Sequence, residues 1–248
     1  MLTHQSNLMI FSAGSLRTTV TQLKPQLEHL TQRSITFTFG PAGLLSKNIQ
    51  SGMQCDLFLS ANMAHPQYLR SIALMKNIMP FCHNSLCLTI ARHHYQPHKT
   101  WIDYISDPAL QLATSTPNCD PSGDYTWQLF DKIAQYNKPL SDYLKRTAQP
   151  LVGGINTITI PPEYTAASFL IQHHNIDMFI GYSHYKSILA RDPKLMVIPI
   201  PAQENIFATY GLAYNDDIAL PIVNYLLSIS GQRYLQQAGF SSIHQTME

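Results

Sequence analysis

The 248-residue chain carries 16 Lys and Arg against 15 Asp and Glu, and 45% of its residues are hydrophobic while 12% are charged. This near-neutral balance gives no basic field for a nucleic acid or an anionic membrane surface, so neither partner is expected. No apolar run reaches the ~18 residues of a membrane-spanning helix, so no membrane insertion is expected either. The length suits one large domain or two lobes with a sizeable core.

The first residues, Met1-Leu2-Thr3-His4-Gln5, lack the basic start and the long apolar segment of a secretory signal peptide. Two alternatives stay open: a cytoplasmic protein, or a protein whose leader has been removed.

Four cysteines, at positions 55, 82, 87 and 119, include no CxxC pair. Cys87 lies in an apolar run and is expected to be a small buried hydrophobic residue. A disulfide between Cys82 and Cys87 in an oxidising compartment is the alternative.

Strands and amphipathic helices alternate through the first third of the chain. Residues 8–11 predict a buried strand, and the turn at residues 12–15 leads into a helix with apolar residues at positions 16, 20, 23, 27 and 30. Ser15 stands where the N-cap of that helix is expected. Strands are predicted at 34–39 and 56–61, with a helix after the turn at 40–43 and another that Asn62 can cap. This order predicts a parallel sheet whose ligands lie beyond the carboxyl ends of the strands.

A basic, histidine-bearing loop follows a strand predicted at residues 86–91 and leads to a short helix at 101–105. It contains Arg92, His93, His94, His98 and Lys99. Because His93 and His94 are adjacent rather than four residues apart, we expect a solvated loop and not a metal site.

Later segments continue the alternation. A strand at 111–115 is followed by a loop in which Ser122 and Asp124 are capping candidates for a helix around 127–134. Gly153-Gly154 breaks the chain, and Pro161-Pro162-Glu163 predicts the start of a helix that runs to His173-His174. Strands are predicted at 177–182, 194–200 and 208–214, and helices at 218–227 and 232–238 close the chain.

Six segments in register together resemble the substrate-binding proteins of molybdate ABC importers, in a molybdate-binding-like branch. They are Ser12-Ala13-Gly14-Ser15-Leu16, the run 39–45, the run 56–63, residues 115–125, residues 177–182, and the closing Gly231-Gln232-Arg233 with Gly239-Phe240. The resemblance spans nearly the whole chain. It implies an α/β, type II periplasmic-binding-protein fold, with two lobes that are each a mostly parallel sheet flanked by helices, joined by two crossovers. Lobe 1 would comprise residues 1–80 and 202–248, and lobe 2 residues 81–201.

The resemblance also implies a ligand, molybdate or tungstate, held between the lobes by uncharged donors. Carried over position by position, these donors are the hydroxyl and N–H of Ser15, the backbone N–H groups at Ala42 and Gly43, the N–H of Ser122, an N–H near Tyr164, and the hydroxyl of Tyr182. Many relatives have a serine where this chain has Ala42, so one hydroxyl is missing. Without the resemblance, Tyr182 reads as a packing residue and Ser122 as a cap. No cofactor and no protein-coordinated metal cation is expected.

The expected function is that of a periplasmic, monomeric solute-binding protein, its leader removed, that passes the oxyanion to an ABC permease. Closure would be a hinge motion near Pro80 and Pro201. Two alternatives stay open: the same fold binding a carboxylate or a phosphate ester, and a cytoplasmic anion-sensing module. An enzyme is not expected, because no GxSxG, HExxH, P-loop or paired-carboxylate motif is present. Glu163 and Asp124 are expected in capping or hinge contacts.

Overall fold

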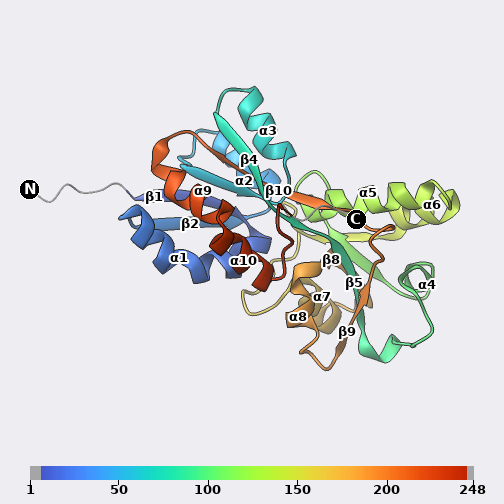
Figure 1. The fold of residues 1–248 in the computed structure, drawn as a ribbon. Coiled ribbons are helices and arrows are strands. Elements are labelled where there is room, and N and C mark those ends of the chain that lie inside the picture. The colour runs from blue at the N-terminus through green and yellow to red at the C-terminus, as the bar shows by residue number, and fades with distance from the viewer. Residues whose placement is uncertain (1–6, 245–248) are drawn as a thin grey trace, which may run out of the picture. The chain divides into compact units, whose positions relative to one another are not determined.

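Two compact α/β units make up the chain in the computed structural model, which describes residues 7–244 (Figure 1). Unit 1 takes the chain up to His83 and again from Ala208, and unit 2 takes Asn84–Phe207. The chain therefore passes between the units twice, as the two-lobed fold with two crossovers requires. Residues 1–5, on which the expectation about a leader depends, lie outside the described residues.

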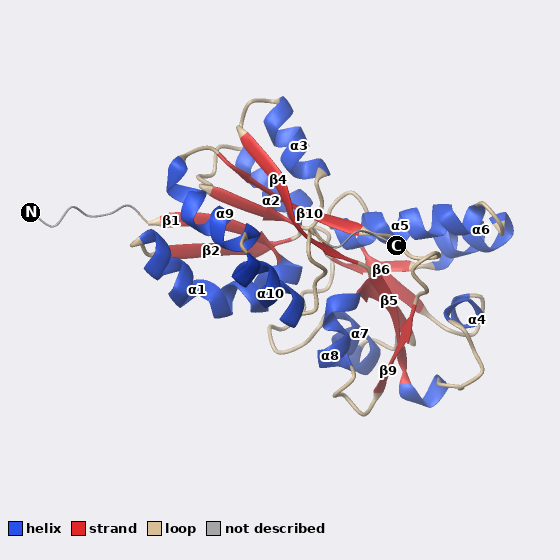
Figure 2. Cartoon of the chain, in the orientation of Figure 1, coloured by secondary structure: helices blue, strands red, loops and turns tan. Residues whose placement is uncertain are grey.

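Unit 1 contains a five-stranded sheet in the order β2-β1-β3-β10-β4 (Figure 2). Its strands are β1 (Leu8–Ala13), β2 (Ile35–Gly40), β3 (Leu57–Ser60), β4 (Asn77–Asn84) and β10 (Ala208–Tyr214). β1 is parallel to both β2 and β3, whereas β10 is antiparallel to β3. The carboxyl ends of β1, β2 and β3 consequently lie at one edge of the sheet, as the sequence predicts.

Helices cover the sheet of unit 1 in two groups. They are the 3₁₀ turn η1 (Gly14–Leu16), α1 (Arg17–Thr31), α2 (Ala42–Gln50), α3 (Ala64–Ser71), η4 (Asp217–Ala219), α9 (Leu220–Leu227) and α10 (Ile229–Gln237). α9 packs between α1 and α10, whereas α2 packs against α3. α1 buries Val20, Leu23 and Leu27 at the predicted helical spacing.

Unit 2 contains a second five-stranded sheet in the order β7-β6-β8-β5-β9. Its strands are β5 (Leu86–Ala91), β6 (Leu112–Ser115), β7 (Gln149–Val152), β8 (Met178–Tyr182) and β9 (Leu195–Pro199). β6 is parallel to β7 and β8, and β5 runs antiparallel to β8 and β9. Every residue of β5 and β8 is buried, which is typical of a sheet covered on both faces.

The helices of unit 2 are spread around its sheet, and α4 (Trp101–Ile105) lies apart from the other labelled helices of the unit (Figure 1). The helical elements of the unit are η2 (Arg92–His94), α4, α5 (Pro121–Ala134), α6 (Lys138–Thr147), α7 (Ala166–His173), η3 (Ser183–Tyr185) and α8 (Lys186–Leu189). α5 packs against α6, while α7 packs on β8 and β5. Within residues 7–244 no helix is both long enough and apolar enough to cross a bilayer.

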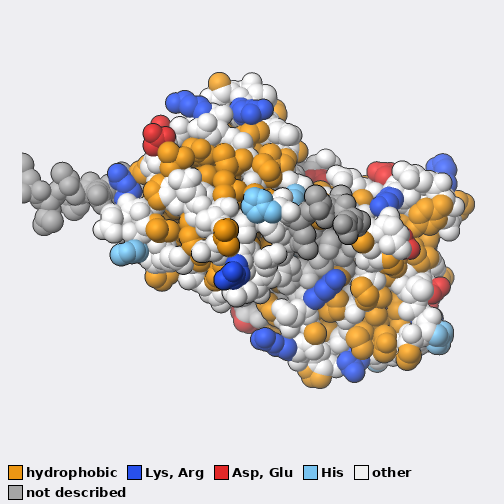
Figure 3. All heavy atoms as spheres, viewed as in Figure 1, with side chains coloured by type: hydrophobic (Ala, Val, Ile, Leu, Met, Phe, Trp, Pro, Cys, Tyr) orange, Lys and Arg blue, Asp and Glu red, His pale blue; other side chains and the backbone are white. Residues whose placement is uncertain are grey.

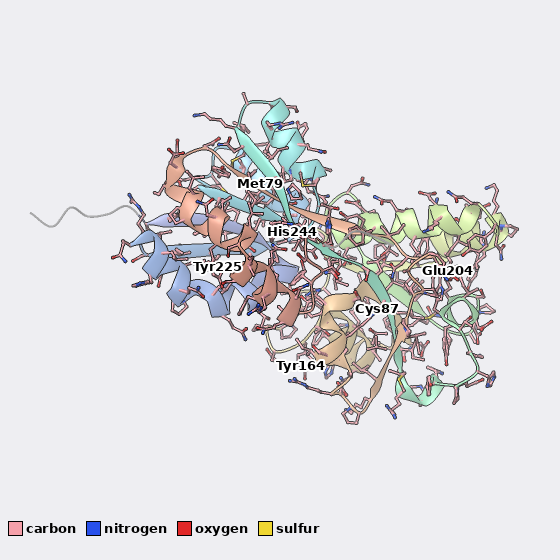
Figure 4. All side chains as sticks on the ribbon, viewed as in Figure 1. Met79, Cys87, Tyr164, Glu204, Tyr225 and His244 are labelled. Atoms are coloured by element: carbon pink, nitrogen blue, oxygen red, sulfur yellow. The ribbon has the colours of Figure 1, made fainter. Side chains whose placement is uncertain are left out.

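The cysteines are all free thiols. Cys87 lies on β5 with its side chain 1% exposed, which confirms the prediction of a small buried residue (Figure 4). Burial raises the pKa of the Cys87 thiol to about 11, and burial also raises the pKa of Cys82. Both thiols are therefore protonated and unreactive at neutral pH.

Several local predictions are wrong, each for a physical reason. The helix expected from Pro161 begins at Ala166, because Thr165 and Ser168 form a reciprocal capping box there. The chain begins η1 at Gly14, so Ser15 lies inside the first turn and is not its cap. Asp120 caps α5 in place of the two candidates Ser122 and Asp124. By contrast, the Asn62 side chain does accept the N–H of His65, at 3.2 Å, as predicted.

Candidate functional site

Two helix starts lie side by side at the carboxyl edge of the unit 1 sheet. Ala13, the last residue of β1, is the register partner of Gly40, the last residue of β2. η1 begins directly after Ala13, and α2 begins two residues after Gly40. The turns are close enough that a Cβ on Gly14 would lie 3.9 Å from the carbonyl oxygen of Gly40. We call this pair of turns the unit 1 edge.

Neither helix start at the unit 1 edge has a side-chain cap. The N-cap positions are Ala13 and Pro41, and neither side chain has an oxygen that could accept an N–H. The first bond of α2 runs from Leu45 N to Pro41 O, at 3.0 Å. The earlier N–H groups of the first turn, which include those of Ala42 and Gly43, precede any intrahelical acceptor. Together with the positive end of the helix dipole, they form a donor set suited to an anion.

A buried tyrosine positions the Ser15 hydroxyl at the same edge. The Oγ of Ser15 lies 3.0 Å from the hydroxyl of Tyr210, which belongs to β10 and is 0% exposed. Edge-on ring contacts to Phe81 and Phe240 hold Tyr210 in place. If Tyr210 donates to the Ser15 oxygen, the Ser15 proton is directed to a further acceptor. Tyr210 was not predicted from the sequence, because 195 residues separate it from Ser15 and no local motif marks it.

A guanidinium group also lies near the unit 1 edge. Arg17, the first residue of α1, places its Cζ 4.4 Å from the ring centre of Phe39, which directly precedes Gly40. Such stacking keeps a cation close to an apolar surface at low cost. The expectation of a site formed by uncharged donors did not anticipate this charge.

In the turn after β3, side chains of the turn itself make the hydrogen bonds that cap the next helix. Ser60 Oγ donates to Asn62 Oδ1 at 3.1 Å, and that oxygen also accepts the N–H of His65. The third strand end of unit 1 is therefore a capped turn, in contrast to the two uncapped turns beside it.

Unit 2 presents a corresponding edge, formed by the carboxyl ends of β6, β7 and β8. Thr116 N donates to Val152 O at 2.8 Å and joins the ends of β6 and β7. α5 begins after this loop, and its Ser122 N–H donates to the side chain of Asp120 at 3.0 Å. The structure thus places Ser122 at the predicted helix start with its amide already engaged by a carboxylate.

Asp120 gives the unit 2 edge its main electrostatic feature. Its carboxylate is packed so closely that a Cβ on Gly153 would lie 2.5 Å from Oδ2. Burial raises the pKa of Asp120 from 3.8 to about 6, although hydrogen bonds from the Ser122 N–H and the Ser115 side chain lower it. Asp120 therefore carries much of its negative charge at neutral pH. In the sequence, Asp120 lies within the segment 115–125 that carries part of the family resemblance, and no role was predicted for it.

The two predicted tyrosines lie in different surroundings within unit 2. Tyr182 ends β8 as predicted, is 5% exposed, and has its ring centre 6.0 Å from that of His184. Tyr164 lies in the turn before α7 (Figure 4), where its ring packs edge-on against Phe169 and His173, with ring centres 5.4 and 5.3 Å apart. The Tyr164 N–H donates to Pro161 O at 3.0 Å, so this amide serves the turn.

Charge is sparse over the molecular surface. In the face shown in Figure 3, charged side chains lie singly among neutral ones and form no extended basic patch. A hollow of about 260 Å³ in unit 2, between α4, α6 and the amino ends of β6 and β8, contains none of the predicted site residues. The two strand edges therefore remain the candidate sites.

Comparisons with known proteins bear on both the family and the fold. The family model described as bacterial extracellular solute-binding protein matches residues 8–241. The uncharacterized protein PM1146 of Pasteurella multocida (strain Pm70) is 36% identical over 244 residues, which cover 96% of this chain and all of that protein.

Two solved structures share the fold at low sequence identity. The sulfate-binding protein SubI from Mycobacterium tuberculosis H37Rv aligns with a TM-score of 0.75 at 14% identity, over 97% of this chain and 88% of that chain. The periplasmic molybdate-binding protein of Azotobacter vinelandii aligns with a TM-score of 0.71 at 15% identity, over 94% of this chain and 98% of that one. At these identities the likeness shows the fold alone.

Proposed function

The chain belongs to the bacterial extracellular solute-binding proteins, and on that premise we propose that it captures a tetrahedral oxyanion, molybdate or tungstate, and delivers it to an ABC permease. The observation that carries this proposal is the pair of uncapped helix starts at the unit 1 edge. Ala13 and Pro41 occupy the N-cap positions, so no side chain competes with an incoming anion for the N–H groups behind them.

Uncharged donors are sufficient to hold a dianion in such a place. A hydrogen bond to an ionised acceptor is about twice as strong as one between neutral groups. The unit 1 edge supplies backbone N–H groups from two helix starts together with the Ser15 hydroxyl, which Tyr210 orients at 3.0 Å. Donors that are fixed in advance need no reordering when the anion arrives, so the binding free energy is not spent on ordering them.

A donor-only site also favours one charge state of the ligand. A fully deprotonated oxyanion offers acceptors in every direction, whereas a protonated one presents a donor to a donor. Molybdate and tungstate are dianions at neutral pH, and their larger size separates them from sulfate in a site of fixed dimensions.

The remaining donors are proposed to come from unit 2 when the two units close around the ligand. Tyr182 is our candidate for a hydroxyl donor, and the helix starts of α5 and α7 are candidates for N–H donors near Ser122 and Tyr164. The amides of Ser122 and Tyr164 would exchange their present acceptors, the Asp120 carboxylate and Pro161 O, for the anion. A ligand that bridges both units would stabilise the closed form by its differential affinity for that form. A periplasmic location and a monomeric state belong to the same proposal.

A second candidate ligand is a small carboxylate or a phosphate ester, and Asp120 favours it. Because the Asp120 carboxyl has a pKa of about 6 and accepts the Ser122 N–H, unit 2 offers one amide fewer to a dianion and a negative charge beside it. A ligand with its own donor group, such as a hydroxy acid, can hydrogen-bond to that carboxylate.

A thermal-shift panel distinguishes these candidates. Tag-free protein is melted at pH 7.5 with molybdate, tungstate, sulfate, phosphate, a phosphate monoester or a hydroxycarboxylate. We expect molybdate and tungstate to raise the melting temperature most, since a ligand that binds only the folded protein stabilises it. A shift with the ester or the hydroxycarboxylate, and none with molybdate, would refute the oxyanion proposal and support the second candidate.

A further inference from the structure

We propose that His93, His94 and Asp177 form a binding site for a divalent transition-metal ion such as Zn²⁺. The three residues lie at the end of the unit 2 sheet opposite to Tyr182. η2 follows the carboxyl end of β5, and Asp177 directly precedes the amino end of β8, which is antiparallel to β5. This site is separate from the proposed oxyanion site and does not depend on it.

The geometry of the ligand atoms carries the proposal. Each of the three residues offers one ligand atom, and these atoms all lie within 4.8 Å of one another. His94 Nε2 is 2.9 Å from Asp177 Oδ1, and the two histidine rings are centred 4.0 Å apart. Zinc binds imidazole nitrogen and carboxylate oxygen at about 2.0–2.2 Å, so ligand atoms around one ion lie roughly 3–4 Å apart. The ligand atoms, all within 4.8 Å of one another, therefore need to approach by about 1–2 Å at most to share one ion.

Backbone hydrogen bonds hold the two segments together before any ion binds. Ala91 N donates to Asp177 O at 2.8 Å, which joins the two segments, and Arg92 N donates to Lys194 O at 2.7 Å, which links the first residue of η2 to the segment before β9. The second carboxylate oxygen of Asp177 accepts the Gln111 N–H at 2.8 Å. That bond fixes the orientation of the carboxylate and leaves Oδ1 directed at His94. Hydrogen bonds of this kind orient the ligands in established metal sites.

The donor set indicates the class of ion. Two imidazole nitrogens and one carboxylate oxygen suit Zn²⁺ and neighbouring transition metals, whereas Ca²⁺ and Mg²⁺ prefer oxygen ligands throughout. His93 is exposed, and the side chains of His94 and Asp177 are 29% and 25% exposed. An ion has a path from solvent, and water can complete its coordination.

A simple His94–Asp177 pair is the competing explanation, and the position of His93 argues against it. A hydrogen-bonded pair accounts for two of the three residues, but it gives no reason for the second imidazole, that of His93, to place a ring nitrogen within 4.8 Å of the same carboxylate. The spacing of His93 and His94 along the chain predicted no metal site. The third ligand comes from a residue 83 positions after His94, which spacing cannot reveal.

The test compares two histidine variants from the same loop. Tag-free protein is treated with a chelator, kept reduced, and titrated with Zn²⁺ in competition with a chromophoric chelator. We expect one saturable site in the wild type and at least a tenfold weaker site in His93→Ala, while His98→Ala binds as the wild type does. Because His93 is exposed, its loss leaves the fold intact, and circular dichroism checks this.

Cobalt gives a second readout. Co²⁺ added to the wild type should produce visible absorption typical of nitrogen and oxygen ligands, and His94→Ala and Asp177→Asn should abolish it. The proposal is overturned if the wild type shows no saturable Zn²⁺ binding. It is equally overturned if His93→Ala binds as tightly as His98→Ala, since the ion would then lie elsewhere, for instance on a cysteine.

Discussion

Replacing Gly123 with alanine is expected to destabilise unit 2 by about 3 kcal/mol, the upper end of the usual cost of overpacking. A Cβ at this position would lie 2.5 Å from the carbonyl carbon of Thr116, and 2.6 Å from both Pro117 N and Ser115 O. All three are backbone atoms, so no side chain can rotate away. The strain would fall on the contact between the first turn of α5 and the loop after β6, which also positions Asp120 and Ser122.

Urea unfolding measures this effect, followed by far-UV circular dichroism for both units and by tryptophan fluorescence for unit 2, where the two tryptophans of the chain, Trp101 and Trp127, lie. Gly40→Ala is the matched control. A Cβ at Gly40 would make ordinary contacts, with the nearest atom a Leu45 side-chain carbon at 3.5 Å, so its free energy of unfolding should change little. Equal stability of the Gly123→Ala and Gly40→Ala variants would contradict the packing seen at the start of α5.

The stability of unit 2 is expected to fall as the pH rises through 6, and Asp120→Asn should abolish this fall. Burial raises the pKa of Asp120 from 3.8 to about 6 in the folded protein. The folded state therefore holds this proton more tightly than the unfolded state does. The resulting stabilisation is complete below about pH 4 and is lost as the pH rises to 6 and above. A pKa shift of this size contributes at most about 3 kcal/mol to the free energy of unfolding.

Asn is a close substitute for protonated Asp120, because its carbonyl oxygen can still accept the Ser122 N–H. We therefore expect Asp120→Asn to unfold at higher urea than the wild type at pH 8, and at about the same urea concentration at pH 4. Asp103→Asn is the control with the opposite sign. Hydrogen bonds from Thr100 lower the pKa of Asp103, so removing the Asp103 carboxylate should lower the free energy of unfolding at pH 8. A wild type less sensitive to pH than Asp120→Asn would contradict the burial of this carboxyl group.

Much of the fold could be predicted from the sequence, because the hydrophobic patterns are local. The apolar runs of β1, β3, β5 and β8 were each predicted as strands, and the order of the first elements implied the parallel pairing of β1 with β2 and β3. The sheet of unit 2 was expected only from the family resemblance. β4, β7, α6 and α8 were not predicted. β7 is a four-residue strand containing Pro150, and proline usually indicates either a loop or a strand at the edge of a sheet.

The candidate site was less predictable, because its chemistry depends on contacts between distant segments. Ser15 was identified from its turn, but Tyr210, which holds its hydroxyl, is 195 residues away. Ser122 was placed at a helix start, yet the choice of Asp120 as the cap depends on the packing of that carboxylate against Gly153. The same limit applies to His93 and His94, whose proposed third ligand, Asp177, lies on another strand.

Isothermal titration of molybdate, tungstate and sulfate into the wild type, Ser15→Ala and Tyr182→Phe tests the central claim most directly. We expect micromolar or tighter binding of molybdate and tungstate and much weaker binding of sulfate. Each variant should lose about 1–3 kcal/mol of binding free energy, the cost of an unreplaced buried hydrogen bond. Equal affinity for all three anions, or molybdate binding that neither substitution weakens, would contradict the claim.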